Sequence, residues 1–482
     1  MKLRLFITTG LLLSTLWLFS QNQEDALRFS KTSMTGTARY MATGGAFGAI
    51  GADFSAIGVN PAGIGMFRKS EFVLTPLINF RKTEVSYFNE LHSDDKYNLG
   101  LGNIGFVYSS GGSNRIQFGF GYNRINNFNN RAYIKGYNDN SSLLSNYVHQ
   151  ADFIHPDNLD PFSTQLAYDS WLIWEDENMF YNNDAYWGHV MQEEKIITEG
   201  SMREVLFSFG SDYNDVFYFG AAVGIPIIRY NYESVFSETD PENKYPEFIS
   251  MKRREIIETR GTGVNLKLGA IGRVGDWLRL GVAFHTPTYY SNMEDKWRVS
   301  MDSELFIDNE IIKKSAESPR GRFKYELTTP MKAIGSASLL LGKSGFISAE
   351  YEFADYTEAK LNSSDYKFES ENKNIRDSYT AAHNLRFGTE WRISDIYFRG
   401  GYALLGSPYK SGINTGKSTQ TSLGLGFRQH DYYIDFAWVN TKMKENRYMY
   451  SVPSDPELEF FTPVAKQNFS EQMYMLTLGW RF

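Results

Sequence analysis

Most of the chain from residue 72 onward alternates between apolar and polar positions. Phe118, Phe120 and Tyr122 alternate with Gly and polar residues. The last strand expected places five apolar side chains on one face: Tyr474, Leu476, Leu478, Trp480 and Phe482. A period of two is typical of β-strands, in which successive side chains point to opposite faces. Each strand therefore has one apolar face, while the other face carries Gly, Ser, Asn and charged residues.

Short turns and long polar segments alternate along this region. Turns are expected at 111–114, 212–215, 273–276, 342–345, 392–395 and 428–431, and long polar loops at 89–97, 138–199, 237–250, 300–320, 361–378, 410–417 and 451–466. A soluble β-sandwich shares the alternation, but a strict asymmetry of turns and loops is typical of transmembrane barrels, with the loops outside. We therefore predict an all-β fold, a transmembrane β-barrel of about 14 antiparallel strands, whose closure leaves no unpaired strand edge in lipid.

The first 20 residues have the features of a secretory signal peptide. Lys2 and Arg4 precede a mostly apolar stretch at 5–19, and polar residues follow from Ser20. This stretch is too short to span a bilayer as a helix, so we expect cleavage after Ser20. A buried N-terminal helix is the alternative. No later run of 18 apolar residues occurs, so the remaining destinations of the exported chain are the periplasm, the medium and the outer membrane. The predicted barrel favours the bacterial outer membrane.

Residues 21–71 lack the period of two and are rich in Gly and Ala. Small residues permit tight turns and close backbone approach, which suits a compact plug inside a narrow lumen. A flexible linker is the alternative, but Tyr40, Phe47, Phe54 and Ile57 are too apolar for a solvated tether. We expect a hatch at 21–71 and the barrel at 72–482.

Composition excludes several classes of function. The chain of 482 residues has no Cys, which excludes disulfides, thiolate metal sites and cysteine nucleophiles. Its net charge of -7 provides no basic field, so nucleic acid is not expected as a partner. The seven His show no metal-ligand spacing, and we expect neither a metal nor another cofactor. His149, His155 and His189 share one loop and leave a haem or metal ligand as the alternative to solvated side chains.

Three short segments in the hatch carry a family resemblance. Residues 44–47 read Gly-Gly-Ala-Phe, residues 53–56 read Asp-Phe-Ser-Ala, and Asn60, Pro61, Ala62 and Gly63 follow just before the first strand. These segments resemble the N-terminal hatch of the FadL/TodX type of outer-membrane transporters for long-chain fatty acids and other hydrophobic compounds. In that family an Asn-Pro-Ala turn closes the hatch. Later segments at 280–287, 329–332 and 348–356 also look like strands of this family.

The resemblance implies lateral diffusion of a hydrophobic substrate. The outer loops of such a protein catch the substrate, which passes to a pocket beside the hatch and leaves sideways at a kink in the third strand. Here the alternation of the third strand breaks at four residues, Arg124, Ile125, Asn126 and Asn127. These residues are the candidate lateral opening, and an ordinary β-bulge is the alternative.

The loop at 138–199 is the longest polar segment. It contains twelve acidic residues and one basic residue, Lys195, together with Trp171, Trp174 and Trp187. Residues 163–179 suggest an amphipathic helix. The aromatic side chains indicate either a groove that captures ligands or a small core that holds the loop together. The acidity favours a neutral ligand over a fatty-acid anion.

These observations predict a non-enzymatic outer-membrane channel for hydrophobic small molecules, either long-chain fatty acids or neutral compounds. A haem-binding receptor and an outer-membrane enzyme acting on lipids are the alternatives. The expected partners are a hydrophobic small molecule or lipid, the outer-membrane lipids with lipopolysaccharide, and the barrel assembly machinery, which would recognise Phe482 at the C-terminus. We expect a monomer.

Overall fold

The computed structural model describes residues 23–33, 35–110, 115–450 and 462–482. The expected signal peptide at 1–20 and the expected turn at 111–114 lie outside the described residues. So does the segment 451–461, which makes up most of the last expected loop.

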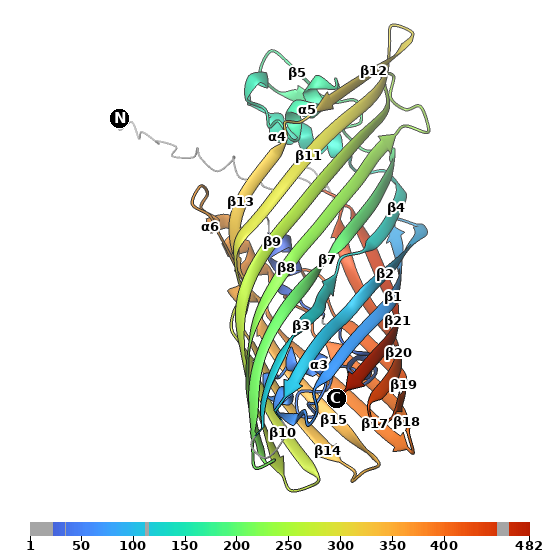
Figure 1. The fold of residues 1–482 in the computed structure, drawn as a ribbon. Coiled ribbons are helices and arrows are strands. Elements are labelled where there is room, and N and C mark those ends of the chain that lie inside the picture. The colour runs from blue at the N-terminus through green and yellow to red at the C-terminus, as the bar shows by residue number, and fades with distance from the viewer. Residues whose placement is uncertain (1–22, 34, 111–114, 451–461) are drawn as a thin grey trace, which may run out of the picture.

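Fourteen strands form a closed antiparallel barrel (Figure 1), as the sequence predicted. Each strand pairs with the next, and the last pairs with the first. In order around the wall they are β1 (Glu71–Tyr87), β2 (Glu90–Ser109), β3 (Ile116–Asn127), β7 (Val190–Tyr213), β8 (Phe217–Thr239), β9 (Phe248–Val274), β10 (Leu278–His285), β14 (Lys332–Leu340), β15 (Gly345–Asp355), β17 (Ala381–Ile393), β18 (Ile396–Leu405), β19 (Ser418–Arg428), β20 (Tyr432–Tyr448) and β21 (Val464–Arg481).

Further strands extend this wall toward the end that carries the long loops. They are β4 (Asn130–Asn138), β11 (Tyr289–Ile307), β12 (Glu310–Glu317), β13 (Gly321–Thr328) and β16 (Lys360–Asn362). The expected loops at 89–97 and 300–320 are therefore wrong, because β2 already begins at Glu90 and β11 and β12 form a hairpin. Polar residues in these segments occupy exposed faces of strands rather than loops.

The short turns that the sequence predicted and the structure describes lie at the opposite end of the barrel (Figure 1). Between β7 and β8, Asn214 and Asp215 both have φ of 54°. Two consecutive residues with positive φ are typical of the tight turns that match the twist of a β-hairpin, and Asn and Asp tolerate this conformation.

The N-terminal segment packs inside the barrel, near the end with the short turns (Figure 1). It contains α1 (Gln23–Ser30), α2 (Ala38–Ala42), α3 (Phe54–Ile57) and the 3₁₀ helix η1 (Pro61–Met66). Glycines of the wall make room for it. A Cβ on Gly105 would lie 2.3 Å from the Phe54 ring, and one on Gly220 would lie 2.2 Å from the Pro61 carbonyl oxygen. A side chain at either glycine would push the segment out of the lumen.

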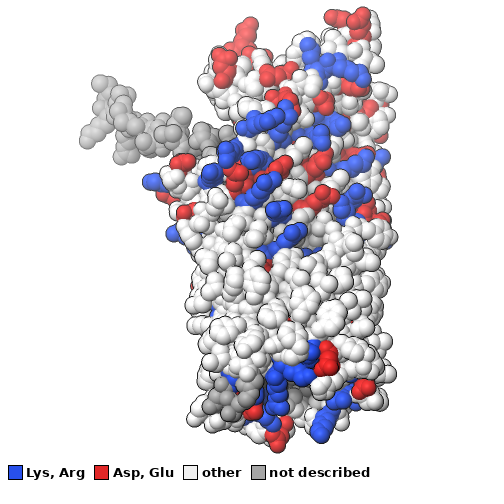
Figure 2. Space-filling view, in the orientation of Figure 1, with Lys and Arg blue, Asp and Glu red and all other residues white. Residues whose placement is uncertain are grey.

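The outer face of the barrel carries an apolar band. Figure 2 shows this band free of charged side chains, with a mixed acidic and basic surface above it. Exposed apolar side chains that form the band on three neighbouring strands are Phe207 and Phe209 on β7, Phe219 and Val223 on β8, and Leu266 and Leu268 on β9. The band has the character of a lipid-facing surface.

The loop between β4 and β7 folds over the end of the barrel. It contains α4 (Leu143–Ala151), the 3₁₀ helix η2 (Pro156–Asn158), α5 (Thr164–Asp169), β5 (Trp174–Glu175) and β6 (Tyr181–Asn182). The helix expected at 163–179 is wrong, because α5 ends at Asp169 and Trp171 has φ of 59°. The 3₁₀ helix η3 (Tyr356–Glu358) and α6 (Glu369–Ser378) lie in another loop. No helix among the described residues is long and apolar enough to cross a membrane.

Candidate functional site

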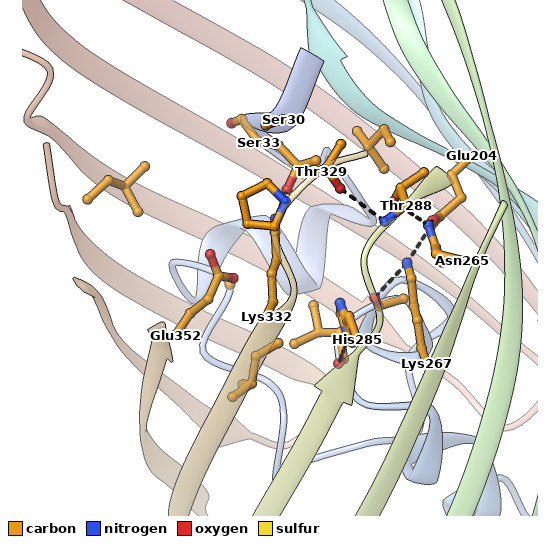
Figure 3. Close-up of a pocket in the computed structure, with 18 of the residues that line it drawn as sticks. Ser30, Ser33, Glu204, Asn265, Lys267, His285, Thr288, Thr329, Lys332 and Glu352 are labelled. Carbon is orange, nitrogen blue, oxygen red and sulfur yellow. Dashed lines mark hydrogen bonds and ion pairs between the residues drawn. The ribbon is translucent and has the colours of Figure 1, made fainter. Parts of the chain in front are cut away.

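A cavity of about 100 Å³ lies between the N-terminal segment and the barrel wall (Figure 3). Phe29, Ser30 and Ser33 contribute to it from the N-terminal side. The wall contributes side chains from β3, β7, β9, β10, β14 and β15, among them Ile125, Glu204, Asn265, Lys267, His285, Lys332 and Glu352.

Polar side chains of the cavity are mostly held by hydrogen bonds. The Lys267 ammonium lies 2.5 Å from a Glu204 carboxylate oxygen and also donates to the Gly58 carbonyl. The Nε2 atom of His285 lies 2.7 Å from the Val59 carbonyl oxygen. Through these contacts, the strands β7, β9 and β10 fix the end of the N-terminal segment.

Lys332 is arranged differently. Its ammonium donates to the Thr32 hydroxyl, and no carboxylate of the described residues lies within 4.0 Å of it. Glu352, which faces Lys332 across the cavity in Figure 3, forms an ion pair with Arg386 at 3.2 Å. The Lys332 ammonium therefore lines the cavity without an ion pair to any described carboxylate.

An apolar cluster continues from the cavity into the upper lumen. Phe29, Ile125 and Tyr290 line the cavity and also belong to this cluster. The rings of Phe29, Phe128 and Tyr230 meet edge to face, with centroids 5.2–6.0 Å apart. The cavity is therefore polar beside the hatch and apolar toward the loops.

The third strand is irregular at the position that the sequence singled out. Its register with β7 shifts between Arg124 and Asn126, and the strand is interrupted between β3 and β4. Pairing between β2 and β3 ends at Asn103 and Asn123. Within the described residues, the part of β2 before Asn103 is hydrogen-bonded as a strand only to β1. One seam of the barrel therefore has no strand hydrogen bonds between described residues from this point toward the loops, and only side chains meet across it, such as His92 of β2 and Tyr133 of β4.

The N-terminal segment covers the inner side of this seam. The amides of Ser33 and Thr35 donate to the carbonyls of Ile125 and Arg124, at 2.8 and 2.7 Å. The Asn126 side chain donates to the Lys31 carbonyl at 3.0 Å. Because Ile125 also lines the cavity, the cavity ends directly at the seam.

The motif from Asn60 to Gly63 lies at the bottom of the lumen. Asn60 caps η1, since its Oδ1 atom accepts from the Ala62 amide at 3.1 Å, and Pro61 occupies the first turn. The Asn60 side-chain amide donates to the Gly48 carbonyl at 2.7 Å. The residue thus joins η1 to the preceding Gly-rich turn.

The carboxyl of Asp53 is buried in the same segment. It accepts from the Thr37 hydroxyl at 2.8 Å and caps α3 through the Ser55 amide. Burial raises the pKa of Asp53, while the nearby Arg39 guanidinium opposes this shift. Arg39 in turn binds Glu390 of the wall at 2.7 Å.

The three tryptophans of the long loop lie on its surface. Trp171, Trp174 and Trp187 are exposed by 47%, 43% and 56%. The Lys314 ammonium lies 3.5 Å above the Trp171 ring. Beneath them, the loop has its own apolar core, which the tops of β8, β9 and β11 complete. The loop thus has the small core that was one interpretation of its aromatic residues, and the three tryptophans lie outside this core.

The histidines of this loop have separate partners. His149 contacts the Tyr186 hydroxyl at 2.8 Å, and His189 contacts Asp139 at 3.2 Å. His155 accepts from the Asp157 amide. Among the residues that the structure describes, no group of three or more His, Asp or Glu is placed to hold a metal ion.

Sequence reasoning missed the charged lining of the cavity. Lys267, His285 and Lys332 lie directly opposite one another on the neighbouring strands β9, β10 and β14, so their proximity depends on strand register. The one available signal is that Lys267 interrupts an uncharged stretch of the inward face of β9, from Ile257 to Ile271.

Solved structures of transporters share this fold. The Pseudomonas aeruginosa FadL homologue matches with a TM-score of 0.57 and 12% identity, over 94% of this chain and 100% of that chain. The Pseudomonas putida toluene transporter TodX matches with a TM-score of 0.54 and 12% identity, over 93% and 99%. The Ralstonia pickettii toluene transporter TbuX matches with a TM-score of 0.52 and 14% identity, over 93% and 99%.

No protein-family model and no curated protein sequence matches the chain. The fold that the resemblance to the FadL/TodX type implied is confirmed by the solved structures, over nearly the whole length of both chains. The chain therefore has the fold of these hydrophobic-compound transporters.

Proposed function

We propose that this protein is an outer-membrane channel for the uptake of hydrophobic small molecules, which leave the barrel sideways into the bilayer. The observation that carries the proposal is the position of the cavity. It ends at Ile125, where the third strand is irregular and its pairing with β2 stops. The transporters with the same fold, two of them named for toluene, support it.

The route begins at the long loop. The exposed rings of Trp171, Trp174 and Trp187 attract apolar molecules from water, because burial of apolar surface is favourable by about 25 cal/mol per Å². The apolar cluster of the upper lumen then leads to the cavity. Exit through the seam at Arg124 to Asn127 places the substrate in lipid without a second passage through water, where each exposed methylene costs about 0.8 kcal/mol.

The N-terminal segment acts as the hatch that makes a sideways exit necessary. It fills the lumen below the cavity, and buried ion pairs such as that between Arg39 and Glu390 hold it to the wall. A straight path to the periplasm would require these contacts to break. Moving only Ser33 and Thr35 away from Ile125 and Arg124 would uncover the seam.

A cross-link across the seam tests the proposal. Lys96 on β2 and Glu199 on β7 form an ion pair of 2.5 Å across the open seam. The chain has no Cys, so Lys96→Cys with Glu199→Cys gives a unique reactive pair. We expect a short, reducible bis-maleimide to stop uptake of a radiolabelled hydrophobic compound into proteoliposomes, and reduction of the linker to restore it.

A matched pair on bonded strands provides the control. Glu233 and Ile256 lie directly opposite each other on β8 and β9, and the same linker between cysteines there should leave uptake unchanged. Uptake that continues through the barrel cross-linked at the seam would contradict lateral exit. Loss of uptake in both cross-linked proteins would show that the linker acts on something other than the seam.

Lys332 lets the same assay distinguish the two classes of substrate. We propose that a carboxylate, if the substrate carries one, lies beside Lys332 while its chain extends along Phe29, Ile125 and Tyr290. Lys332→Met should then lower uptake of a long-chain fatty acid and leave a neutral hydrocarbon unaffected. Equal effects on both compounds would assign Lys332 to the structure of the cavity alone.

We further propose that the barrel assembly machinery inserts the chain as a monomer and recognises its C-terminal strand. Phe482 directly follows β21, and its backbone exchanges two hydrogen bonds with Ser70 just before β1. Deletion of Phe482 should lower the amount of heat-modifiable barrel in isolated outer membranes. An unchanged amount would remove Phe482 from the assembly signal.

A further inference from the structure

A groove of about 1320 Å³ lies on the outer face of the barrel, beside β1, β19, β20 and β21. These strands are neighbours on one side of the wall (Figure 1). The loop at 406–417 between β18 and β19 forms its outer wall. Thr415 and Tyr448 hold this loop against β20, through hydrogen bonds to the carbonyls of Lys444 and Ile413.

One row of residues crosses the floor of the groove. Lys82 on β1 is directly opposite Ser470 on β21, Ser470 is opposite Lys442 on β20, and Lys442 is opposite Thr419 on β19. Directly opposite residues of antiparallel strands have Cβ atoms about 5 Å apart. The small Ser470 side chain thus separates two lysines and leaves space between their ammonium groups.

The charge of the groove is strongly one-sided. Its lining contains Lys82, Lys410, Lys417, Lys442 and Lys444, and among the described lining residues the only acid is Glu84, which binds Lys82 at 2.8 Å. No carboxylate of the described residues lies within 4.0 Å of Lys417, Lys442 or Lys444.

Several basic residues elsewhere on the outer face are paired with acids. Arg254 binds Glu233, Lys313 binds Glu304, and Arg322 binds Glu294. The groove is therefore a site at which the wall leaves neighbouring lysines without the acids that neutralise comparable side chains on other strands. Such a concave positive surface attracts anions.

The height of the groove on the wall identifies the kind of anion. Ile78 on β1, Phe436 on β20 and Tyr474 on β21 are exposed apolar side chains on the same outer faces, nearer the end with the short turns. The lysines thus lie at the border where the lipid-facing band ends on the side of the long loops. This border lies at the headgroups of the outer leaflet if the long loops are extracellular.

We propose that this groove binds the phosphate groups of an anionic outer-leaflet lipid, whose acyl chains lie along the apolar band below it. The lysines supply several ammonium donors around Ser470, and Lys binds phosphate as a compact point charge. The proposal rests on the outer-membrane placement of the barrel and not on transport, so loss of one does not imply loss of the other.

Native mass spectrometry of the full-length protein in detergent tests the proposal, with lipid A and phosphatidylcholine as probes. Since each Lys near an anionic lipid surface contributes to binding, we expect the Lys417→Gln, Lys442→Gln, Lys444→Gln variant to bind lipid A about 100-fold more weakly than the native chain. Binding of phosphatidylcholine should be the same in both proteins. Heat-modifiable migration in gels verifies that the variant is folded.

A second triple variant removes the same charge elsewhere. Lys252→Gln, Lys313→Gln and Lys324→Gln alter exposed lysines of β9, β12 and β13, far from the groove, and should leave lipid A binding unchanged. Equal weakening in both variants would overturn the site, because net charge alone would then govern binding. Complete displacement of lipid A by millimolar inorganic phosphate would overturn the lipid assignment, because the acyl chains would then contribute nothing.

Discussion

The same alternation along a strand places different kinds of side chain outside and inside in the two halves of the barrel. In the half near the short turns, β9 points Leu266 and Leu268 outward and buries Asn265 and Lys267 against the N-terminal segment, where Lys267 donates to the Gly58 carbonyl. In the half near the long loops, the same strand exposes Arg254, and buried apolar clusters line the inside of the wall beside buried polar side chains such as Glu194 and Glu238. Figure 2 shows the outer side of this change, where the uncharged band gives way to charged side chains.

The difference shows that each face of a strand adapts to what it meets. The lower half has the apolar band outside and a hydrogen-bonded segment inside, whereas the upper half has charged side chains outside and two buried apolar clusters inside. A transmembrane strand needs only about 9–11 residues. The 27 residues of β9 and the 24 of β7 therefore continue well beyond the bilayer, as the wall of a water-exposed barrel.

Shortening a leucine should reveal the largest difference between the halves. Leu327 of β13 is fully buried in the upper lumen, so Leu327→Ala should lower the free energy of unfolding by about 2–5 kcal/mol. Leu266→Ala on the outer face of the lower half should cost less than about 1 kcal/mol, because lipid chains fill the space. Denaturant unfolding in lipid vesicles measures both. Equal losses would mean that the upper lumen is not a packed core.

Adding a charge to the outer face should destabilise the lower half of the barrel and leave the stability of the upper half nearly unchanged. Phe207→Arg lies within the apolar band and should cost about 2–4 kcal/mol near the middle of the membrane. Ile256→Arg on the upper part of β9, between the exposed Arg254 and Glu258, should cost less than about 0.5 kcal/mol, as most surface substitutions do. Similar costs for both variants in the same vesicle assay would mean that the bilayer does not surround the band that contains Phe207.

The difference between the two halves also explains how much of the fold the sequence could predict. Alternation and turn chemistry are local, so the strands and the described turns were predicted well. The ends of the strands were not, because charged segments such as 89–97 were interpreted as loops. A strand that leaves the membrane keeps its hydrogen bonds but changes the polarity of its outer face, and composition alone cannot separate this from a loop.

The candidate site shows a similar limit. The break at Arg124 to Asn127 was visible because it interrupts a local period. The cavity was not, since Lys332 on β14 and Phe29 on α1 meet only after the barrel closes. The lysine groove depends on the register of four strands, in which Lys82 and Lys442 are separated by 360 positions in the chain but by only one intervening strand, β21.

A smaller effect is expected where the lower half meets its hatch. Asn60→Ala removes the cap of η1 and the bond to Gly48, and loss of a cap costs about 1 kcal/mol. The hatch should loosen while the barrel remains, so single-channel conductance for small ions should rise. Asn60→Asp retains the acceptor for the Ala62 amide and loses only the donor to Gly48. If the conductance rises in neither variant, the motif at Asn60 does not keep the lumen closed.

The smallest effect concerns the long loop above the upper half. Burial raises the pKa of Asp160, despite the hydrogen bonds that it accepts from Ser163 and the Phe162 amide. For a carboxyl group with a raised pKa in the folded state, the stabilisation is present below the unfolded pKa and is lost as pH rises through the folded pKa. The loop should therefore become easier to cleave by a protease as the pH rises through that range, after correction for protease activity. Asp160→Asn should flatten this dependence, whereas Asp157→Asn, at an exposed carboxyl, should retain it. If the pH dependence of cleavage persists in Asp160→Asn, another titratable group of the loop causes it.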